Sequence, residues 1–159
     1  MKLKKVTLLI LLFSVSITGM FADSAWAKGL SVAPASYEWK DVKTGSKIKC
    51  PAGIAAKNNS KELRSYIMRA VKPSEIGLKP SRGYDEIPFT DWVSFGQKIV
   101  PLEPGKWKRL TLFIEIPEEK KYLGRKWEFY LEVKEYTTGL EMFTLSCQVK
   151  FLITTVKKP

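Results

Sequence analysis

Apolar and polar residues alternate along residues 101–119 of the chain. Four apolar side chains in this stretch share one parity: Leu110, Leu112, Ile114 and Ile116. An alternation of period two is typical of a β-strand that buries one face. A Pro-Gly pair at 104–105 favours a turn before the run, and Pro117 favours the end of the strand after it. The pattern predicts a bounded strand of about ten residues.

The same alternation recurs along the chain between regular turn signals. Residues 121–136 place one set of side chains inward and the intervening set outward: Trp127, Phe129, Leu131 and Val133 against Glu128, Tyr130, Glu132 and Lys134. Further strands are expected within 29–34, 37–45, 46–60, 89–100 and 141–155. Pro51 and Gly53 favour a bulge or an edge in the third of these segments.

Two segments are less regular. Residues 62–71 fit either a strand or a short helix, and their neighbours favour a strand. Residues 72–88 are rich in Pro, Gly and Ser, which favours a loop or a pair of short edge pieces. About seven short strands separated by turns predict an all-β, immunoglobulin-like antiparallel β-sandwich.

The first 27 residues have the pattern of a secretory signal peptide. A basic start, an apolar stretch of about sixteen residues and small residues at 25 and 27 favour cleavage between Ala27 and Lys28. The alternative is an uncleaved anchor, but the apolar stretch is shorter than the ~20 residues of a spanning helix. We therefore expect a single domain at 28–159 with no membrane span after cleavage, located in the periplasm, outside the cell or at its surface.

The chain is strongly basic, with a formal net charge of +11. The leader holds three basic residues and one acidic residue, so the mature chain has 24 basic and 15 acidic residues, a net +9. A basic exported protein could meet anionic wall polymers, lipid head groups or acidic proteins. The lysines are spread along the chain, however, which is also typical of an ordinary solvated surface. No nucleic-acid motif is present, and we expect no nucleic-acid partner.

The two cysteines, Cys50 and Cys147, share the inward parity of their strands. An even pair in an exported chain favours a disulfide, and we expect a Cys50–Cys147 bridge. The alternative is two separate buried thiols.

Several kinds of chemistry find no support in the sequence. The chain has no histidine, which excludes Ser-His-Asp and Cys-His catalysis and histidine-ligated zinc. Asp85, Glu86 and Asp91 gather in one segment, but they fit a solvated acidic loop near Lys79 and Arg82 better than a calcium site. We expect no enzyme activity, no cofactor and no metal.

Several turn and strand-end residues follow an order known from other sandwiches. These residues are Gly45, Asn58 to Ser60, Leu102 to Gly105, Pro117 and Gly124. Over about 43–135 the chain resembles bacterial immunoglobulin-like modules of the NPCBM-associated galactosidase and WxL-protein peptidoglycan-binding types, and more distantly the PapD-like pilus chaperones. The resemblance implies that these residues are scaffold. It carries over no ligand-binding residue, because the two-domain cleft of PapD-like chaperones has no counterpart in a single domain.

Large aromatic residues at outward positions are the candidate binding residues. Trp107, Arg109, Thr111 and Phe113 share the outward parity of their strand, and Lys108 lies beside them. Aromatic residues beside arginine are typical of interface hot spots. The predicted binding residues are therefore Trp107, Lys108, Arg109 and Phe113, unless a neighbouring loop covers them. Trp39, Trp92 and Tyr84 lie near strand ends or loops and are further candidates.

These observations favour an exported, non-enzymatic module that binds another envelope or surface protein, as an accessory or chaperone-like partner of an adhesin or pilus system. The exposed edges of a sandwich suit strand addition. The alternative is a cell-wall or glycan-binding module that uses basic and aromatic surface residues, with an anionic wall polymer as partner.

Overall fold

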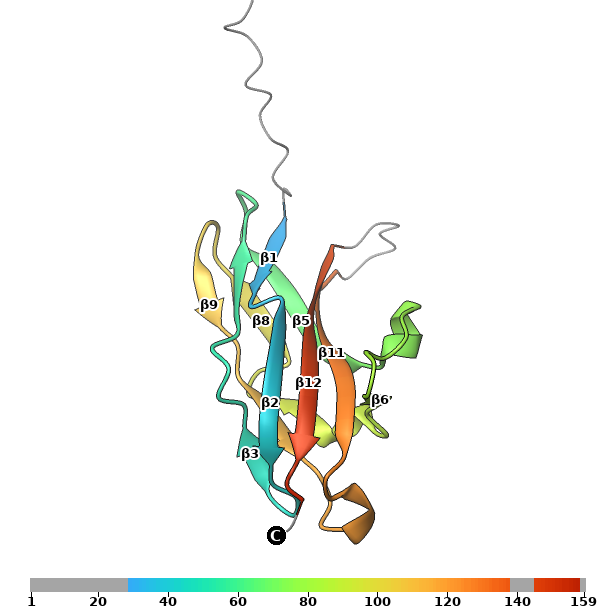
Figure 1. Cartoon of the computed structure of the whole chain (residues 1–159). Helices are drawn as coiled ribbons and strands as arrows, with labels where there is room; N and C mark the ends of the chain where they lie inside the picture. Colours follow the sequence, from blue (N-terminus) through green and yellow to red (C-terminus); the bar gives the residue numbers. More distant parts are fainter. Residues whose placement is uncertain (1–28, 138–144, 158–159) are drawn as a thin grey trace, which may run out of the picture.

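A computed structural model describes residues 29–137 and 145–157, so the predicted leader and the first part of the strand predicted within 141–155 lie outside the described residues. Three 3₁₀ turns, η1 (Pro73–Ile76), η2 (Thr90–Trp92) and η3 (Lys120–Tyr122), interrupt a chain of strands (Figure 1). The strands are β1 (Leu30–Ala33), β2 (Ser36–Val42), β3 (Lys47–Lys49), β4 (Ala55–Asn58), β5 (Arg64–Val71), β6 (Asp85–Glu86), β7 (Val93–Phe95), β8 (Ile99–Leu102), β9 (Trp107–Arg109), β10 (Leu112–Glu115), β11 (Lys126–Glu135) and β12 (Ser146–Thr155).

The segments group into the seven strands of an immunoglobulin-like sandwich, because four of the seven are split in two. The splits separate β1 from β2, β3 from β4, β7 from β8, and β9 from β10. The break between β3 and β4 contains Pro51 and Gly53, as the sequence predicts. The small strand β6 stands outside this set, in the connection between β5 and β7. The ambiguous segment 62–71 is a strand, β5, as predicted.

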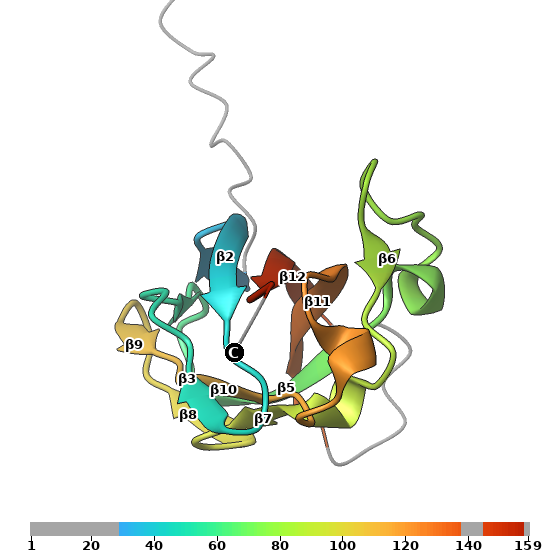
Figure 2. The same cartoon turned by 60° about the horizontal axis from the view of Figure 1, so that its bottom comes forward.

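Two layers face each other across the core, as the end-on view shows (Figure 2). One layer joins β1-β4-β9 to β3-β10-β7, and two backbone bonds hold the junction: Cys50 N–H to Leu112 O at 2.8 Å and Leu110 N–H to Ile54 O at 2.8 Å. The other has the order β2-β12-β11-β5-β8. The strand pairs are antiparallel except for β2 with β12 and β6 with β11, which are parallel.

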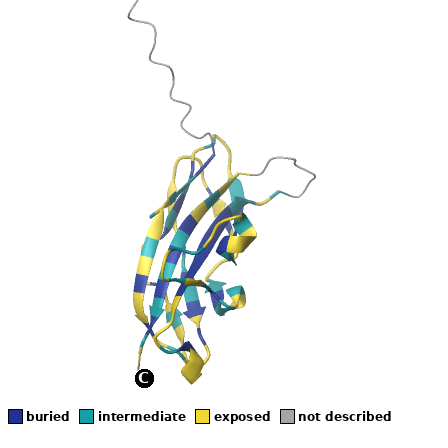
Figure 3. Ribbon diagram, turned by 45° about the vertical axis from the view of Figure 1, so that its right-hand side comes forward, coloured by how far each residue is buried: buried dark blue, intermediate teal, exposed yellow. Residues whose placement is uncertain are grey.

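The core forms where the inward parities of the two layers meet (Figure 3). Leu110, Leu112, Ile114 and Ile116 are all buried, which confirms the parity read from the sequence. Trp127, Phe129, Leu131 and Val133 are buried opposite them, and Phe129 stacks on Phe151 at 4.8 Å between ring centroids. Burial of these side chains provides the main favourable free energy of folding.

The outward parity of β11 differs from the expectation of a solvated face. Glu128, Tyr130 and Glu132 point away from the core but are buried as well. The 72–92 segment, which carries η1 and β6, runs along this side of β11 (Figure 2). Period two predicts which side chains share a face, but a covering segment from elsewhere in the chain decides whether that face meets water.

Candidate binding surface

Three of the predicted binding residues form the edge strand β9. Trp107 has 54% of its surface exposed, and Lys108 and Arg109 are exposed beside it. β9 pairs with β4 through the register Lys57 to Trp107 and Ala55 to Arg109. It is the last strand of β1-β4-β9, so the described residues place no strand along its other side. The sequence therefore located an exposed aromatic-basic edge.

Two hollows flank β9, and Lys108 lines both. The first, of about 390 Å³, is framed by Trp107 and by residues from the turn before β5 and from β8: Leu63, Pro101, Leu102, Glu103 and Lys106. The second, of about 270 Å³, reaches core atoms of Met68, Val100 and Leu110 between the two layers. Leu63 is 65% exposed, which is unusual for a leucine next to a tryptophan that is also exposed.

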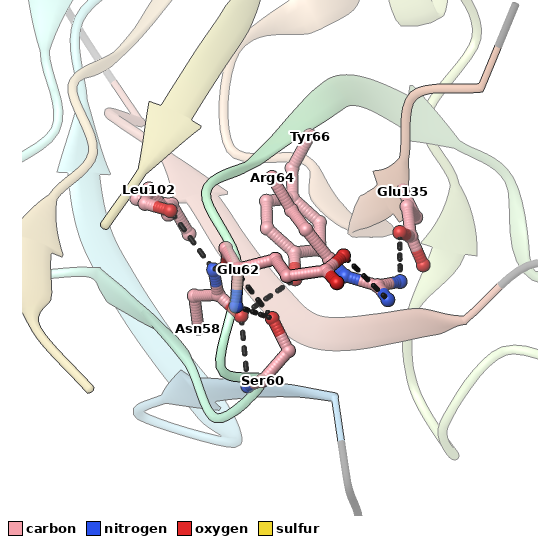
Figure 4. A network of polar contacts seen from close by, with 7 residues as sticks. All are labelled: Asn58, Ser60, Glu62, Arg64, Tyr66, Leu102 and Glu135. Atoms are coloured by element: carbon pink, nitrogen blue, oxygen red, sulfur yellow. Dashed lines mark hydrogen bonds and ion pairs between the residues drawn. The ribbon is translucent and has the colours of Figure 1, made fainter. Parts of the chain in front are cut away.

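The turn that presents Leu63 and the turn that precedes Trp107 are tied together by Asn58, which has no exposed surface (Figure 4). Its Nδ2 donates to Glu62 O at 2.7 Å and to Leu102 O at 2.9 Å. Its Oδ1 accepts from Ser60 N–H at 2.9 Å, and its backbone carbonyl accepts from Gly105 N–H at 2.7 Å. Asn58 is scaffold, as the resemblance implied, and it fixes the geometry of the Trp107 surface.

Glycine is required at position 105 of this arrangement. Gly105 has a φ of 70°, a left-handed conformation that residues with a side chain rarely adopt. Its turn brings the chain from β8 in one layer to β9 in the other, as the Pro-Gly signal predicted. Arg64 and Glu135 form an ion pair beside this network, and the pairing raises the pKa of the Arg64 guanidinium (Figure 4).

Phe113, the fourth predicted binding residue, lies elsewhere. It sits in β10, a central strand, between Lys49 of β3 and Ser94 of β7. Its ring is half-buried beneath Lys47, whose Nζ lies 5.1 Å from the ring centroid. Phe113 shares the outward face with Trp107, but the structure brings Leu63 and Lys106 to Trp107 instead. In the sequence, the signal for Leu63 as a neighbour of Trp107 was a leucine within the otherwise polar turn at 58–63.

The other aromatic candidates lie apart from β9 and apart from one another. Trp39 is buried and is therefore not a surface residue. Trp92 is half-buried and packs against Phe89, Tyr122 and Trp127 at ring-centroid distances of 5.3, 4.9 and 5.6 Å. Phe89 is 51% exposed in this cluster; Trp92 lines a hollow of about 450 Å³, and Tyr122 and Trp127 line another of about 210 Å³. Tyr84 is half-buried, with Lys126 Nζ 5.8 Å from its ring centroid.

A buried acid lies under the 72–92 segment. Glu128 is fully buried; its Oε2 accepts from Ser81 N–H at 2.7 Å, and its Oε1 lies 3.8 Å from Lys150 Nζ. Burial alone would raise the pKa of Glu128, but contacts with Ser81 and Tyr130 and the charge of Lys150 outweigh it and lower the pKa below its ordinary value. Lys150 also donates to Ser81 Oγ at 3.1 Å. This cluster fastens the covering segment to β11.

The predicted Cys50–Cys147 bridge is not formed in the structure, where both cysteines are free thiols. Cys147 Sγ donates to Leu30 O at 3.3 Å, and Leu30 pairs with Asn58, eight positions along the chain from Cys50. At ~3.3 Å per extended residue, that offset is on the order of 20 Å, far beyond the ~7 Å between Cα atoms that a disulfide allows. Shared inward parity placed both thiols against the core but did not fix their positions along it.

We expect the two thiols to differ in reactivity. Burial raises the pKa of both, but Cys50 is buried and Cys147 only half-buried. Under native, non-reducing conditions near pH 8, a maleimide reagent should label Cys147 first, and Cys50 only as the protein unfolds. In denaturant both should be labelled. Mass spectrometry of the labelled peptides measures the extent of labelling. If neither cysteine is labelled in denaturant, the result would support the predicted Cys50–Cys147 disulfide.

Among the described residues, no three His, Cys, Asp or Glu side chains converge as a metal site would require. Glu86 of the acidic loop instead accepts hydrogen bonds from Ser74 N–H at 2.6 Å and Ser74 Oγ at 2.9 Å.

In the same described part of the chain, no helix has the length and apolar character needed to cross a membrane.

No protein-family model and no curated protein sequence matches the chain. Its fold does match solved structures. A PapD-like domain of human CEP192 has 7% identity and a TM-score of 0.56, with 83% of this chain and 88% of that chain covered. The E. coli chaperone DraB has 10% identity and a TM-score of 0.54, with 81% and 56% covered. A proposed carbohydrate binding protein from Bacteroides ovatus has 11% identity and a TM-score of 0.54, with 80% and 37% covered.

The chain thus spans most of the CEP192 domain but little more than half of DraB. At these identities the likeness shows the fold alone, which is the immunoglobulin-like sandwich. The all-β sandwich predicted from the sequence and its distant likeness to PapD-like chaperones are confirmed. The nearer resemblance to galactosidase-associated and WxL-type modules gains no support.

Proposed function

We propose that this protein is an exported, non-enzymatic module that binds another envelope or surface protein, in an accessory or chaperone-like role in an adhesin or pilus system. The observation that carries the proposal is Trp107, more than half exposed on an edge strand beside the exposed Leu63 and the basic side chains of Lys106, Lys108 and Arg109. Tryptophan and arginine are enriched in interface hot spots. The likeness in fold to a chaperone supports a binding role.

Replacing Trp107 tests the proposal. Trp107→Ala should weaken binding to proteins from an envelope extract of the source organism by about tenfold or more, with the melting temperature nearly unchanged, because an exposed ring contributes little to the core. Phe113→Ala should be measured separately, since Phe113 lies apart from Trp107 in the fold. Binding can be followed by surface plasmon resonance on the immobilised mature protein.

Leu78→Ala is the matched control, because Leu78 is also a large exposed apolar residue, 45% exposed, in the 72–92 segment. It should bind as the wild type does. If Trp107→Ala instead lowers stability by about 3–5 kcal/mol, the ring belongs to the core and the proposed site is wrong. If Trp107→Ala binds like the control, the protein-binding function does not reside at β9.

The second candidate is a cell-wall or glycan-binding module. It is favoured by the aromatic cluster around Trp92. The exposed ring of Phe89 packs on Trp92, which lines one hollow, and Tyr122 and Trp127 line another. For this function, isolated wall polymer should bind to the wild type, Phe89→Ala should abolish that binding, and Trp107→Ala should leave it intact. Binding through the basic surface would collapse at high salt, whereas a protein interface centred on Trp107 would largely survive it.

Export is part of the proposal, and it rests on the leader pattern. The mature protein should begin at Lys28 and form one domain from there to Pro159, in the periplasm or at the cell surface. The intact mass of protein from the exported fraction measures this directly. A mass that still contains residues 1–27 would contradict the cleavage and favour an anchored form.

A further inference from the structure

One side of β9 has no neighbouring strand among the described residues, because β7 ends before it reaches that position. β7 pairs with β10, and the Gly96 N–H donates to Thr111 O at 3.0 Å. After Gly96 the chain leaves this layer and joins β5 of the other layer as β8. Among the described residues, no strand therefore continues the position of β7 alongside β9. Figure 2 shows β9 at the margin of the fold, and β8 belongs to the sheet β2-β12-β11-β5-β8.

The backbone of β9 is oriented to accept a strand there. Leu110 N–H donates to Ile54 O on the β4 side, and Thr111 O accepts on the β7 side. Successive residues of a strand direct their backbone groups to opposite sides. The N–H and C=O groups of Trp107 and Arg109 therefore point away from β4, toward the vacant side. They offer two donors and two acceptors to an incoming segment.

The neighbouring edge strand, β8, cannot accept an added strand in the same way. Its pairing with β5 directs the backbone groups of Ile99 and Pro101 outward, because Met68 N–H donates to Lys98 O and residues alternate from there. Proline has no N–H to donate, and edge prolines protect against strand addition. The Pro101 carbonyl is already approached by Lys108 Nζ at 3.4 Å. Of these two neighbouring edges, only β9 is left open.

The side chains around this open edge define the chemistry of the occupant. Lys106, Lys108 and Arg109 line the two hollows against one acid, Glu103, whose carboxylate is already paired with Lys106 at 3.0 Å. Lys108 takes the inward parity and reaches across the gap, and an inward-pointing lysine discourages pairing with purely apolar strands. Trp107 and Leu63 offer an apolar contact next to the basic groups.

We propose that β9 binds an extended acidic segment of a partner protein by β-strand addition, with a large apolar side chain of that segment packed against Trp107 and Leu63. This inference rests on the proposed protein-binding function and names its mode. Main-chain bonds to Trp107 and Arg109 supply affinity, and the lysines and arginine select an acidic sequence.

The test uses synthetic capped peptides of about six residues, the length of a short strand. One alternates glutamate with leucine, one replaces glutamate by lysine, and one is the acidic peptide N-methylated at alternate residues, which keeps the side chains but removes the donors. We expect the acidic peptide to bind the mature protein and to protect the Trp107 and Arg109 amides from hydrogen exchange measured by NMR. N-methylation and the change to lysine should each weaken binding about tenfold or more.

Equal binding of the methylated peptide, protection at other amides, or no binding of the acidic peptide would each overturn strand addition at β9. The proposed function has a separate readout, because the effect of Trp107→Ala on binding to envelope proteins does not depend on any peptide. If Trp107→Ala weakens binding to envelope proteins but the peptide does not protect the Trp107 and Arg109 amides, the proposed function holds and the strand-addition mode is wrong. Arg109→Pro, which removes one outward donor but no bond to β4, should weaken peptide binding more than Arg109→Ala does.

Discussion

Asn58→Ala should lower the free energy of unfolding by about 3 kcal/mol, because each buried polar group left without its partner costs about 1–3 kcal/mol. The side chain satisfies the carbonyls of Glu62 and Leu102 and accepts from the Ser60 amide, and all of its own surface is buried. An alanine cannot replace these bonds, and the bond to Leu102 O is fully buried, away from bulk water. Urea unfolding followed by tryptophan fluorescence measures the change.

The adjacent Asn59 provides the control. Asn59 is exposed, and its Nδ2 donates to Ser31 Oγ at 2.7 Å at the surface. Asn59→Ala should therefore change the free energy of unfolding by only about 0.5 kcal/mol. Similar losses in both variants would show that the Asn58 network is not a special support. Because Asn58 also holds the turns that carry Leu63 and Trp107, its replacement should weaken partner binding as well.

Lys150→Met should lower the free energy of unfolding by about 2 kcal/mol at pH 7. Removing one member of a buried ion pair typically costs about 3–5 kcal/mol, and we take a smaller value because the lysine is itself partly exposed. The fully buried carboxylate of Glu128 would lose the charge that lies 3.8 Å from its Oε1. Methionine keeps the length and apolar stem of the side chain, so the loss reports on the charge together with the hydrogen bond to Ser81 Oγ.

The loss should depend on pH in a definite direction. In the wild type the folded-state pKa of Glu128 is lowered, so its contribution to stability is present above its unfolded pKa of about 4.3 and disappears as the pH falls through the folded value. In Lys150→Met burial is less opposed, and the folded pKa should rise relative to the wild type. The difference in stability between the two proteins should therefore be large at neutral pH and shrink below about pH 4.

Lys40→Met is the control for this comparison. Lys40 pairs with Glu38 at 3.5 Å, but both side chains are exposed. Surface ion pairs contribute about 0–1 kcal/mol, so this variant should stay close to the wild type at every pH. A Lys150→Met loss that is the same at pH 3 and pH 7 would mean that the lysine acts through packing and its hydrogen bond to Ser81, and that the charge of Glu128 does not depend on it.

The sequence by itself determined the parts of this protein that depend on neighbours along the chain. Alternation placed Leu110, Leu112, Ile114 and Ile116 in the core, because successive side chains of a strand point to opposite faces. Pro-Gly and Asn-Asn-Ser located turns, because these residues favour the required backbone angles and side-chain bonds. From these local rules followed the immunoglobulin-like sandwich, its division into strands and the outward position of Trp107.

Only the tertiary structure decided what each face meets. Parity left Glu128 on the outside of β11, and the 72–92 segment, from a distant part of the sequence, buried it. Parity pointed Cys50 and Cys147 inward, but their offset along the strands, which no local pattern fixes, keeps their sulfurs apart. The same long-range pairing placed Phe113 in a central strand and brought Leu63 beside Trp107, because strand order and register arise from packing of the whole core and not from any one segment.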